Sequence, residues 1–250
     1  MKTTLSIITA TFNSASTLAD CLASVSSQSI PAEHLIIDGG STDTTLAVAA
    51  SYPHVSKVIS EPDAGIYDAM NKGIALATGD VVGILNSDDF YASKEVLAWV
   101  AEIFADQSVD SCYGDLVYVD SSDTNRVTRS WKSGEFKDKG FYWGWMPPHP
   151  TFFVRRSVYE KYGTFNLKLG SAADYELMLR FLVKHKISTA YIPEVLVKMR
   201  AGGVSNVTLG NRLKANRMDR YAWTVNGLTP YPWTIIAKPL RKVGQFLHKK

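Results

Sequence analysis

The first third of the chain alternates short apolar runs with helical patterns, and polar turns separate them. Leu5–Thr11 is β-branched or apolar, and Leu18, Leu22 and Val25 then recur at helical spacing. The same alternation continues through residues 35–85. Repeated strand and helix units predict an α/β fold with a mainly parallel sheet and helices on both faces. Ligands of such sheets bind beyond the carboxyl ends of the strands, so residues directly after each strand are the first candidates for a site.

Two of the polar turns carry residues suited to a nucleotide. Residues 9–13 and 38–43 each stand at the end of an apolar run. The carboxylate of Asp38 can accept hydrogen bonds from a nucleobase N–H or from ribose hydroxyls, and Gly39 lets the backbone approach a flat ligand closely. In the alternative interpretation, Asp38 and Ser41 form a turn that caps the next helix.

A third polar turn, residues 86–89, follows the apolar residues 81–85. Its Asp88 and Asp89 offer hard oxygen ligands that suit Mg or Mn, and such an ion can bridge a diphosphate. Adjacent acids at a strand end also occur in polar turns that bind nothing. Between the second and third turns, Asp68 and Lys72 are four residues apart at a helix start, a spacing also typical of a surface ion pair.

The segments 9–13, 38–43, 61–73 and 85–89 together resemble glycosyltransferase family 2 in order, spacing and strand context. The resemblance covers roughly residues 3–205 and is strongest to the bacterial branch that builds exopolysaccharides such as colanic acid and O-antigens. It implies a GT-A fold, with a Rossmann-like, mainly parallel sheet, and transfer of a sugar from a nucleotide-sugar donor with inversion. The expected donor-binding residues are Thr9, Thr11, Asn13, Asp38, Gly39, Ser41, Asp63, Asp68, Asn71, Lys72, Asn86, Ser87 and Asp88.

The resemblance also implies a divalent metal, Mn or Mg, at the third turn and a later aspartate as catalytic base. That aspartate is Asp174, for which a helix N-cap is the alternative. Many relatives carry Asp-x-Asp where this chain has Asn86-Ser87-Asp88, so the first position cannot be an anionic ligand. Asp88 is therefore expected to be the main metal ligand, Asp89 to support it, and Asn86 to bind the ribose.

The acceptor side is expected to involve four residues. His149 lies between two prolines, in a segment that similar enzymes place beside the acceptor pocket, and a histidine packed in a rigid turn is the alternative. Trp145 belongs to an aromatic cluster whose faces could stack on a sugar, although aromatic clusters also form core or lid packing. Gly203 and Ser205 lie in a glycine-containing segment that resembles a flap over the diphosphate, with a plain turn as the alternative.

The C-terminal part differs from the rest in charge. Residues 211–250 hold nine Lys or Arg and one Asp, a net charge of +8, so residues 1–210 sum to −5. We expect a catalytic domain over 1–210 and a basic, aromatic-rich segment over 211–250 that lies on an anionic membrane surface. A basic helix packed on the main domain is the alternative. No nucleic-acid-binding motif accompanies the charge, so nucleic acid is not an expected partner.

These features predict a metal-dependent, inverting hexosyltransferase. We expect a UDP-hexose donor and a polyprenyl-diphosphate-linked saccharide acceptor. No run approaches the roughly 20 apolar residues of a spanning helix, so we expect a cytoplasmic protein, peripheral on the inner face of the membrane. One alternative is a nucleotidyltransferase that makes nucleotide sugars, although the glycine-rich phosphate loop typical of that class is absent after the first strand. A non-catalytic nucleotide-sugar-binding protein is the other.

Overall fold

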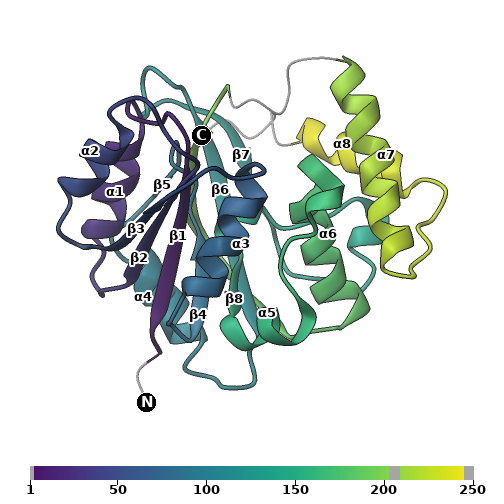
Figure 1. The fold of residues 1–250 in the computed structure, drawn as a ribbon. Coiled ribbons are helices and arrows are strands. Elements are labelled where there is room, and N and C mark those ends of the chain that lie inside the picture. The colour runs from purple at the N-terminus through teal and green to yellow at the C-terminus, as the bar shows by residue number, and fades with distance from the viewer. Residues whose placement is uncertain (1–2, 203–208, 245–250) are drawn as a thin grey trace.

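A computed structural model describes residues 3–202 and 209–244 of the chain. Within these residues, a nine-stranded sheet crosses the molecule, in the order β3-β2-β1-β4-β8-β6-β9-β5 with β7 beside β6 (Figure 1). The strands are β1 (Leu5–Thr11), β2 (Glu33–Asp38), β3 (Val55–Ser60), β4 (Val81–Ile84), β5 (Phe90–Tyr91), β6 (Ser111–Val119), β7 (Val127–Trp131), β8 (Phe153–Arg155) and β9 (Thr189–Arg200).

Helices cover both faces of the sheet. The α-helices are α1 (Leu18–Ser26), α2 (Thr45–Ala50), α3 (Ile66–Leu76), α4 (Val96–Ile103), α5 (Arg156–Tyr162), α6 (Ala173–Leu179), α7 (Leu209–Val225) and α8 (Thr234–Gly244). Short 3-10 turns lie at η1 (Phe141–Trp143), η2 (His149–Thr151) and η3 (Leu167–Ala172), and a π-helical turn, η4 (Arg180–Lys184), extends α6. The predicted α/β fold is therefore confirmed.

The direction of the strands divides the sheet into two halves. β3, β2, β1 and β4 are all parallel, as the repeated strand and helix units predict. Antiparallel pairing begins at β8, which lies between β4 and β6, and β9 then runs parallel to β6. Because β2 pairs with one side of β1 and β4 with the other, the chain order reverses at β1. Ligand sites of open α/β sheets form at such a switch point.

Alternating side chains of β1 pack into two separate hydrophobic cores, one on each face of the sheet. Ile7 packs with α1 and α4, whereas Ile8 packs with α3 and α6 on the other face. Figure 1 shows α1, α2 and α4 on one side of the sheet and α3, α5 and α6 on the other. Gly73 of α3 lies directly on Ile8, where a Cβ atom would collide with the isoleucine side chain. The glycine at this position therefore allows α3 to pack closely on β1.

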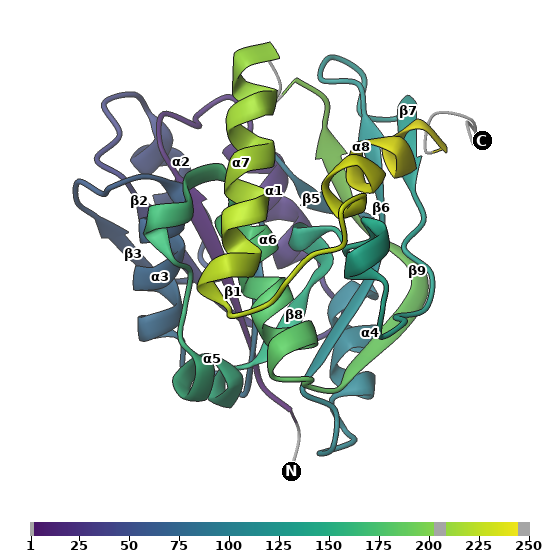
Figure 2. The same ribbon diagram turned by 90° about the vertical axis from the view of Figure 1, so that its right-hand side faces the viewer.

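The described part of the C-terminal segment packs on the main body. Trp223 of α7 is fully buried, and its indole N–H donates to the hydroxyl of Tyr175 in α6 at 2.9 Å. The amide of Asn226 donates to Glu176, also in α6, at 2.9 Å. Figure 2 shows α7 and α8 on one side of the molecule, next to α6. The described residues beyond 210 therefore pack on α6, and the expected domain boundary at residue 210 stays a prediction.

Candidate active site

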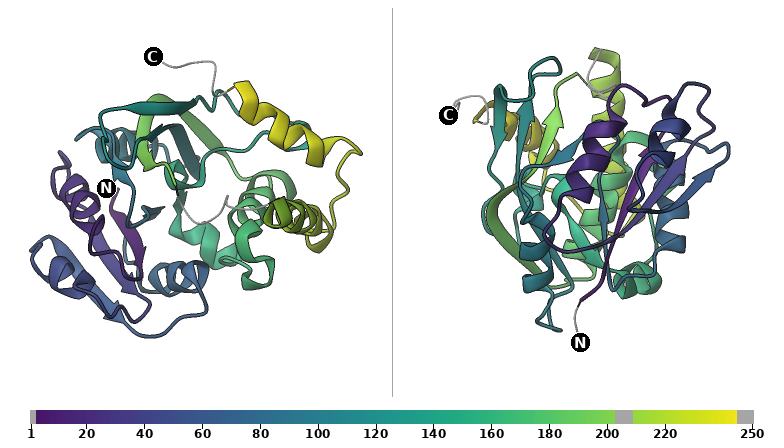
Figure 3. Two further views of the ribbon diagram at one scale, coloured as in Figure 1. Left: turned by 90° about the horizontal axis from the view of Figure 1, so that it is seen from above. Right: turned by 90° about the vertical axis from the view of Figure 1, so that its left-hand side faces the viewer.

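The three polar turns meet at the carboxyl ends of β1, β2 and β4, the edge seen from above in the left view of Figure 3. The side-chain oxygen of Asn13 accepts a hydrogen bond from Thr42 N at 2.9 Å, and Asn13 N donates to Ser41 Oγ at 2.8 Å. Asn13 adopts a left-handed conformation, with φ of 49°, which asparagine tolerates better than most residues. Ser87 Oγ donates to Ser14 Oγ at 2.9 Å and so joins the third turn to the first.

The carboxylate of Asp38 organises the second turn from inside. It is fully buried and accepts hydrogen bonds from Gly40 N at 3.1 Å, Ser41 N at 2.9 Å, Ser60 Oγ at 2.6 Å and the Ser41 hydroxyl. Burial acts to raise the pKa of Asp38, but these hydrogen bonds outweigh it and lower the pKa below its usual value. Asp38 is therefore an anion that fixes the loop, as the turn interpretation describes, and its contact with a base remains a prediction.

Asp63 connects the second turn with the start of α3. A Cβ atom on Gly39 would lie 2.5 Å from Asp63 Oδ2, so the glycine makes room for this carboxylate. Asp63 Oδ1 accepts from Gly65 N at 2.8 Å, and Asp68 Oδ2 accepts from Ala64 N at 3.0 Å. Gly65, with φ of 111°, lets the chain turn into α3. Asp63 thus lies beside the second turn, and Asp68 holds the backbone that follows Asp63.

Three residues predicted to bind the donor have their side chains engaged elsewhere. Both ends of the Asn71 amide bond to the backbone of Phe165, each at 2.9 Å, so Asn71 joins α3 to the segment before η3. Lys72 pairs with Glu61 at 2.9 Å and with Asp68 at 3.7 Å, which is the ion pair foreseen as its alternative role. Thr9 is buried, with its hydroxyl 3.0 Å from His34 Nε2.

The third turn exposes one of its two carboxylates. Asp88 is partly exposed, whereas Asp89 is buried and accepts a hydrogen bond from the Asn86 amide at 2.9 Å. Burial, and then the charge of Asp88, raise the pKa of Asp89 to about 8. The side chains of Asn86 and Asp89 thus bond to each other, and their expected roles at the ribose and at a metal stay predictions.

Arg200, to which the sequence assigns no role, holds the third turn in place. It ends β9, is almost fully buried, and donates from Nη1 to the backbone carbonyl of Asp88 at 2.6 Å. It also forms an ion pair with Asp20 of α1, and its guanidinium lies 5.1 Å from the centre of the Phe90 ring. The sequence signal for such a residue is an arginine that stands at the end of an apolar strand pattern, since arginine is seldom buried without a partner. Gly203 and Ser205, predicted to form a flap, lie outside the described residues.

A second cluster surrounds Asp174, the predicted base. Asp174 is the second residue of α6 and accepts from its own neighbour, Tyr175 N, at 2.7 Å. Burial and then the charge of Asp174 raise the pKa of Tyr67 in α3 well above its usual value. Burial lowers the pKa of His149, and the charge of Asp174 partly opposes this shift. The sequence pairs neither residue with Asp174, because the three come from different elements.

Phe165 packs between the two neighbours of Asp174. Its ring centre lies 5.2 Å from that of Tyr67 and 5.4 Å from that of His149. Asn71 fixes the same residue by its backbone, as described above. This packing sets the positions of Tyr67 and His149 next to the carboxylate. His149 therefore lies near the predicted base, and its contact with an acceptor stays a prediction.

Trp145 has a packing role. It is buried, its indole N–H donates to Ser133 O at 2.8 Å, and its ring packs edge-on against Tyr113 and Phe141. This buried position is that of the core-packing alternative, and contact of Trp145 with the acceptor stays a prediction.

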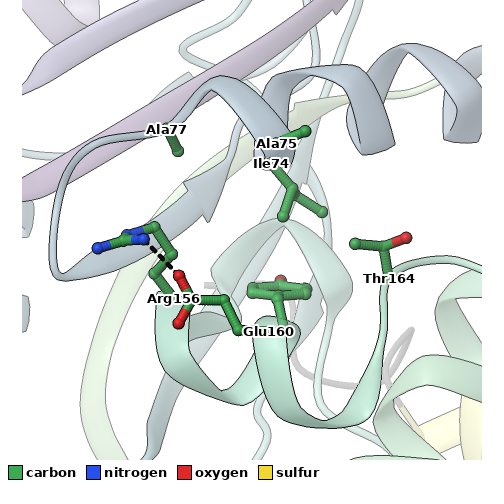
Figure 4. A pocket seen from close by; sticks show the side chains of 7 residues that line it. Ile74, Ala75, Ala77, Arg156, Glu160 and Thr164 are labelled. Atoms are coloured by element: carbon green, nitrogen blue, oxygen red, sulfur yellow. Dashed lines mark hydrogen bonds and ion pairs between the residues drawn. The ribbon is translucent and has the colours of Figure 1, made fainter.

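A shallow pocket at the far end of α3 is separate from this site. It is lined by Ile74 and Ala75 of α3, by Ala77 directly after α3, and by residues of α5 and the loop after it, as Figure 4 shows. Arg156 and Glu160 form an ion pair at its mouth. Its α3 residues belong to the C-terminal half of the helix, whereas Tyr67 stands at the N-terminal end.

The third turn has a donor set compatible with Mg or Mn. In the part of the chain that the structure describes, no three His, Cys, Asp or Glu side chains gather to hold a metal by themselves. A single carboxylate, Asp88, remains partly exposed at the strand edge. Mg is commonly bound through one or two carboxylates together with substrate phosphates and water. The residues therefore fit a metal that arrives with a diphosphate.

Comparisons with known sequences point to one family. The model of glycosyl transferase family 2 matches residues 6–163. A Mycobacterium bovis protein named as a PGL/p-HBAD biosynthesis glycosyltransferase is 32% identical over 208 residues, which cover 80% of this chain and 78% of that protein. An uncharacterized glycosyltransferase of Mycobacterium tuberculosis is 35% identical over 186 residues, covering 71% of this chain and 68% of that protein.

Solved structures share the fold at lower identity. TarS 1–349 of S. aureus, in complex with UDP-GlcNAc, has a TM-score of 0.70 at 18% identity, covering 98% of this chain and 71% of that chain. In a longer TarS structure, this chain spans 43% of the length. A mannosyltransferase of Pyrobaculum calidifontis, in complex with GDP-Man and Mn2+, has a TM-score of 0.66 at 17% identity, covering 95% and 69%. With its predicted GT-A fold confirmed, this chain belongs to glycosyltransferase family 2.

Proposed function

We propose that this glycosyltransferase is inverting and metal-dependent, and that it transfers a hexose from UDP to a hydroxyl group of a lipid-linked saccharide. The observation that carries the proposal is the placement of two acidic groups. Asp88 lies at the carboxyl edge of the parallel strands, beside the two polar turns, and Asp174 lies at the start of α6, next to Tyr67 of α3. An acidic group at the strand edge supports the binding of a metal with a diphosphate, and a separate carboxylate at the start of α6 supports deprotonation of an acceptor.

The donor side is assigned to the first two turns and to Asp63. Asn13, Asp38 and Ser41 form one hydrogen-bonded unit that holds the loop, and Gly39 makes room for the Asp63 carboxylate beside it. A preorganised loop of this kind loses little entropy when it binds a flat base and a ribose. UDP is our choice of nucleotide because the TarS complex contains UDP-GlcNAc, with GDP second because the mannosyltransferase complex contains GDP-Man.

Asp174 is assigned as the base. Its carboxylate takes the proton of the acceptor hydroxyl while that oxygen attacks the anomeric carbon of the sugar. The bond from this carbon to the diphosphate oxygen breaks on the opposite face, which inverts the configuration. A bound Mn or Mg supplies positive charge next to the departing diphosphate. Asp88 would hold that ion at the strand edge, and Arg200 donates a hydrogen bond to the backbone carbonyl of Asp88.

A lipid-linked acceptor and a peripheral position on the inner face of the cytoplasmic membrane complete the proposal. The basic C-terminal segment supports both, since it carries a net charge of +8 toward anionic headgroups. The Mycobacterium bovis relative is named as a glycosyltransferase of PGL/p-HBAD biosynthesis, so it too is assigned to a biosynthetic reaction. In the ranges 3–202 and 209–244, no helix is both long and apolar enough to cross a membrane.

A binding titration tests the donor site directly. UDP and GDP are titrated into the wild type, Asp88→Ala and Asp123→Ala, with and without Mn. Asp123 is an exposed aspartate in the loop between β6 and β7 and serves as the matched control. Metal-dependent binding of one nucleotide that only Asp88→Ala loses supports the proposal. If neither nucleotide binds the wild type, the site assignment is wrong; tight binding without turnover on any acceptor favours the non-catalytic alternative.

A further inference from the structure

An apolar patch on the surface joins two segments that are distant in sequence. Trp143 of η1 is 51% exposed, Trp233, just before α8, is 44% exposed, and Ile236 of α8 is 63% exposed. The rings of Trp143 and Trp233 lie 5.5 Å apart, and Tyr231 lies 5.1 Å from Trp233. Large side chains of this kind are usually buried, so their collection at one place on the surface marks an interaction site.

The patch rests on a rigid base. Thr234 Oγ1 donates to Tyr142 O at 2.8 Å and fixes the start of α8 on η1. Gly144, directly after η1, lies against the backbone of Ala237 and Lys238, where any Cβ atom would collide. α8 therefore presents Ile236 outward because its opposite side is held against the main body. The exposure of Ile236 is a consequence of this docking and not of a loose helix.

Cationic side chains lie on α8 and in the segment just before η1, together with two carboxylates, Glu135 and Asp138. Arg241 is exposed on α8 and shares a small pocket with Lys137 and Glu135, and Lys139 is exposed two residues before η1. The one acidic residue of the 211–250 segment, Asp219, is paired with Lys238 at 2.7 Å. No unpaired carboxylate of that segment therefore opposes its remaining positive charges.

We propose that Trp143, Trp233 and Ile236 insert into the headgroup region of an anionic lipid bilayer while Arg241 and Lys137 contact lipid phosphates. Tryptophan and tyrosine favour the membrane interface, and an amphipathic basic helix lies in its plane. Two copies of this chain meeting through the patch would bring two strongly positive segments together, so charge favours the bilayer over self-association. The inference rests on the proposed lipid-linked acceptor. A membrane bound at the patch would hold the sugar of that acceptor near α6.

Vesicle binding of the full chain, measured without any donor, tests this surface separately from the reaction. Vesicles of phosphatidylcholine with phosphatidylglycerol are compared with vesicles of phosphatidylcholine alone. The wild type is expected to sediment with the anionic vesicles and much less with the neutral ones. Ile236→Ser is expected to weaken partitioning at least about tenfold, because burying a side chain of this size is worth more than that factor. Arg241→Gln is expected to weaken it about fivefold.

Leu46→Ser is the matched control. Leu46 is also an exposed apolar residue, but it lies on α2, on the opposite side of the sheet from α8 (Figure 1). This variant is expected to bind vesicles as the wild type does. Brominated lipid should quench the tryptophan fluorescence of the wild type. A double variant that carries both Trp143→Phe and Trp233→Phe should lose most of that quenching.

Three results would contradict the proposal that this patch binds a membrane. The first is equal sedimentation with neutral and anionic vesicles, and the second is unchanged partitioning of Ile236→Ser. The third is conversion of a dimer to a monomer by Ile236→Ser without lipid, which would make the patch an interface between copies. The nucleotide titration on the same variants separates the two proposals. Vesicle binding without nucleotide binding rejects the proposed reaction alone, whereas nucleotide binding without vesicle binding rejects only the membrane surface.

Discussion

The guanidinium of Arg200 donates a hydrogen bond to the backbone carbonyl of Asp88 at 2.6 Å. The two residues are 112 positions apart, at the end of β9 and in the turn after β4. Through its ion pair with Asp20, the same guanidinium also reaches α1. One side chain thus determines the position of the turn that carries the proposed metal ligand.

Replacing Arg200 by Met should weaken metal-dependent nucleotide binding by about tenfold or more, since a hydrogen bond to a charged donor contributes about 1.5–3 kcal/mol. Arg200→Lys should recover only part of the loss, because an ammonium group cannot bridge Asp88 and Asp20 as a guanidinium does. Titration calorimetry with Mn and nucleotide measures both. Arg126→Met, at an exposed arginine, is the control. Wild-type affinity in Arg200→Met at unchanged melting temperature would show that the turn needs no such support.

Asp174→Asn should lower kcat by about 10²–10⁴ while nucleotide affinity stays near the wild-type value. The amide keeps the shape of the side chain and can still accept from Tyr175 N, but it cannot take a proton. Turnover and nucleotide binding are measured on the same preparation. Asp123→Asn should retain full activity. Retention of more than about a tenth of the rate by Asp174→Asn contradicts its role as the base.

Acid should destabilise the protein through His34. Burial, and then the neighbouring His54, lower the pKa of His34 to about 3, whereas an unfolded histidine has a pKa near 6.5. Between these values the unfolded state binds more protons, so stability is complete above about pH 6.5 and falls as the pH drops below it. From pH 7 to pH 5 this group should remove about 2 kcal/mol of unfolding free energy.

Denaturant unfolding of wild type and His34→Gln at several pH values measures this contribution. The variant should lose about 2 kcal/mol less than the wild type over the same pH interval, whatever its stability at pH 7. His185→Gln, at a histidine nearer the surface, should keep most of the pH dependence that the wild-type free energy of unfolding shows. Parallel curves for wild type and His34→Gln would mean that the buried imidazole does not govern the acid response.

Trp223→Ala should reduce the free energy of unfolding by about 3–5 kcal/mol, the usual cost of removing a large, fully buried aromatic side chain. The change also leaves the hydroxyl of Tyr175 without its indole partner. Trp233→Ala, which removes an exposed tryptophan from the same segment, should cost much less. Urea denaturation compares the two. Similar losses for both variants would contradict the burial of α7 on α6.

The parallel half of the fold follows from local sequence patterns. Strand-length apolar runs and helical spacing over residues 5–85 locate β1 to β4 and the helices between them, and each polar turn marks a strand end. Beyond residue 110 the local pattern weakens, because β6, β8 and β9 pair across long stretches of chain. The antiparallel insertion of β8 therefore has no local signal.

The sequence identifies site residues better by position than by side-chain direction. Alternation along β1 places Thr9 on the face of Ile7, towards α1, and this is deducible from the strand alone. The partners of Asn71 and Arg200 are not deducible, since they lie 94 and 112 residues away. The burial of Asp89 depends likewise on how the third turn folds back on Asn86.

The attachment of α7 to α6 has a consequence for the order of events during protein synthesis. The ribosome completes the three polar turns early, but Tyr175 and Glu176, which follow Asp174, receive their partners Trp223 and Asn226 some fifty residues later. A nascent chain that ends before α7 thus contains the residues assigned to donor binding. Its α6, which carries the proposed base Asp174, still lacks the hydrogen bonds from Trp223 and Asn226. Synthesis of the last helices therefore completes the hydrogen bonds of α6 only when most of the chain has left the ribosome.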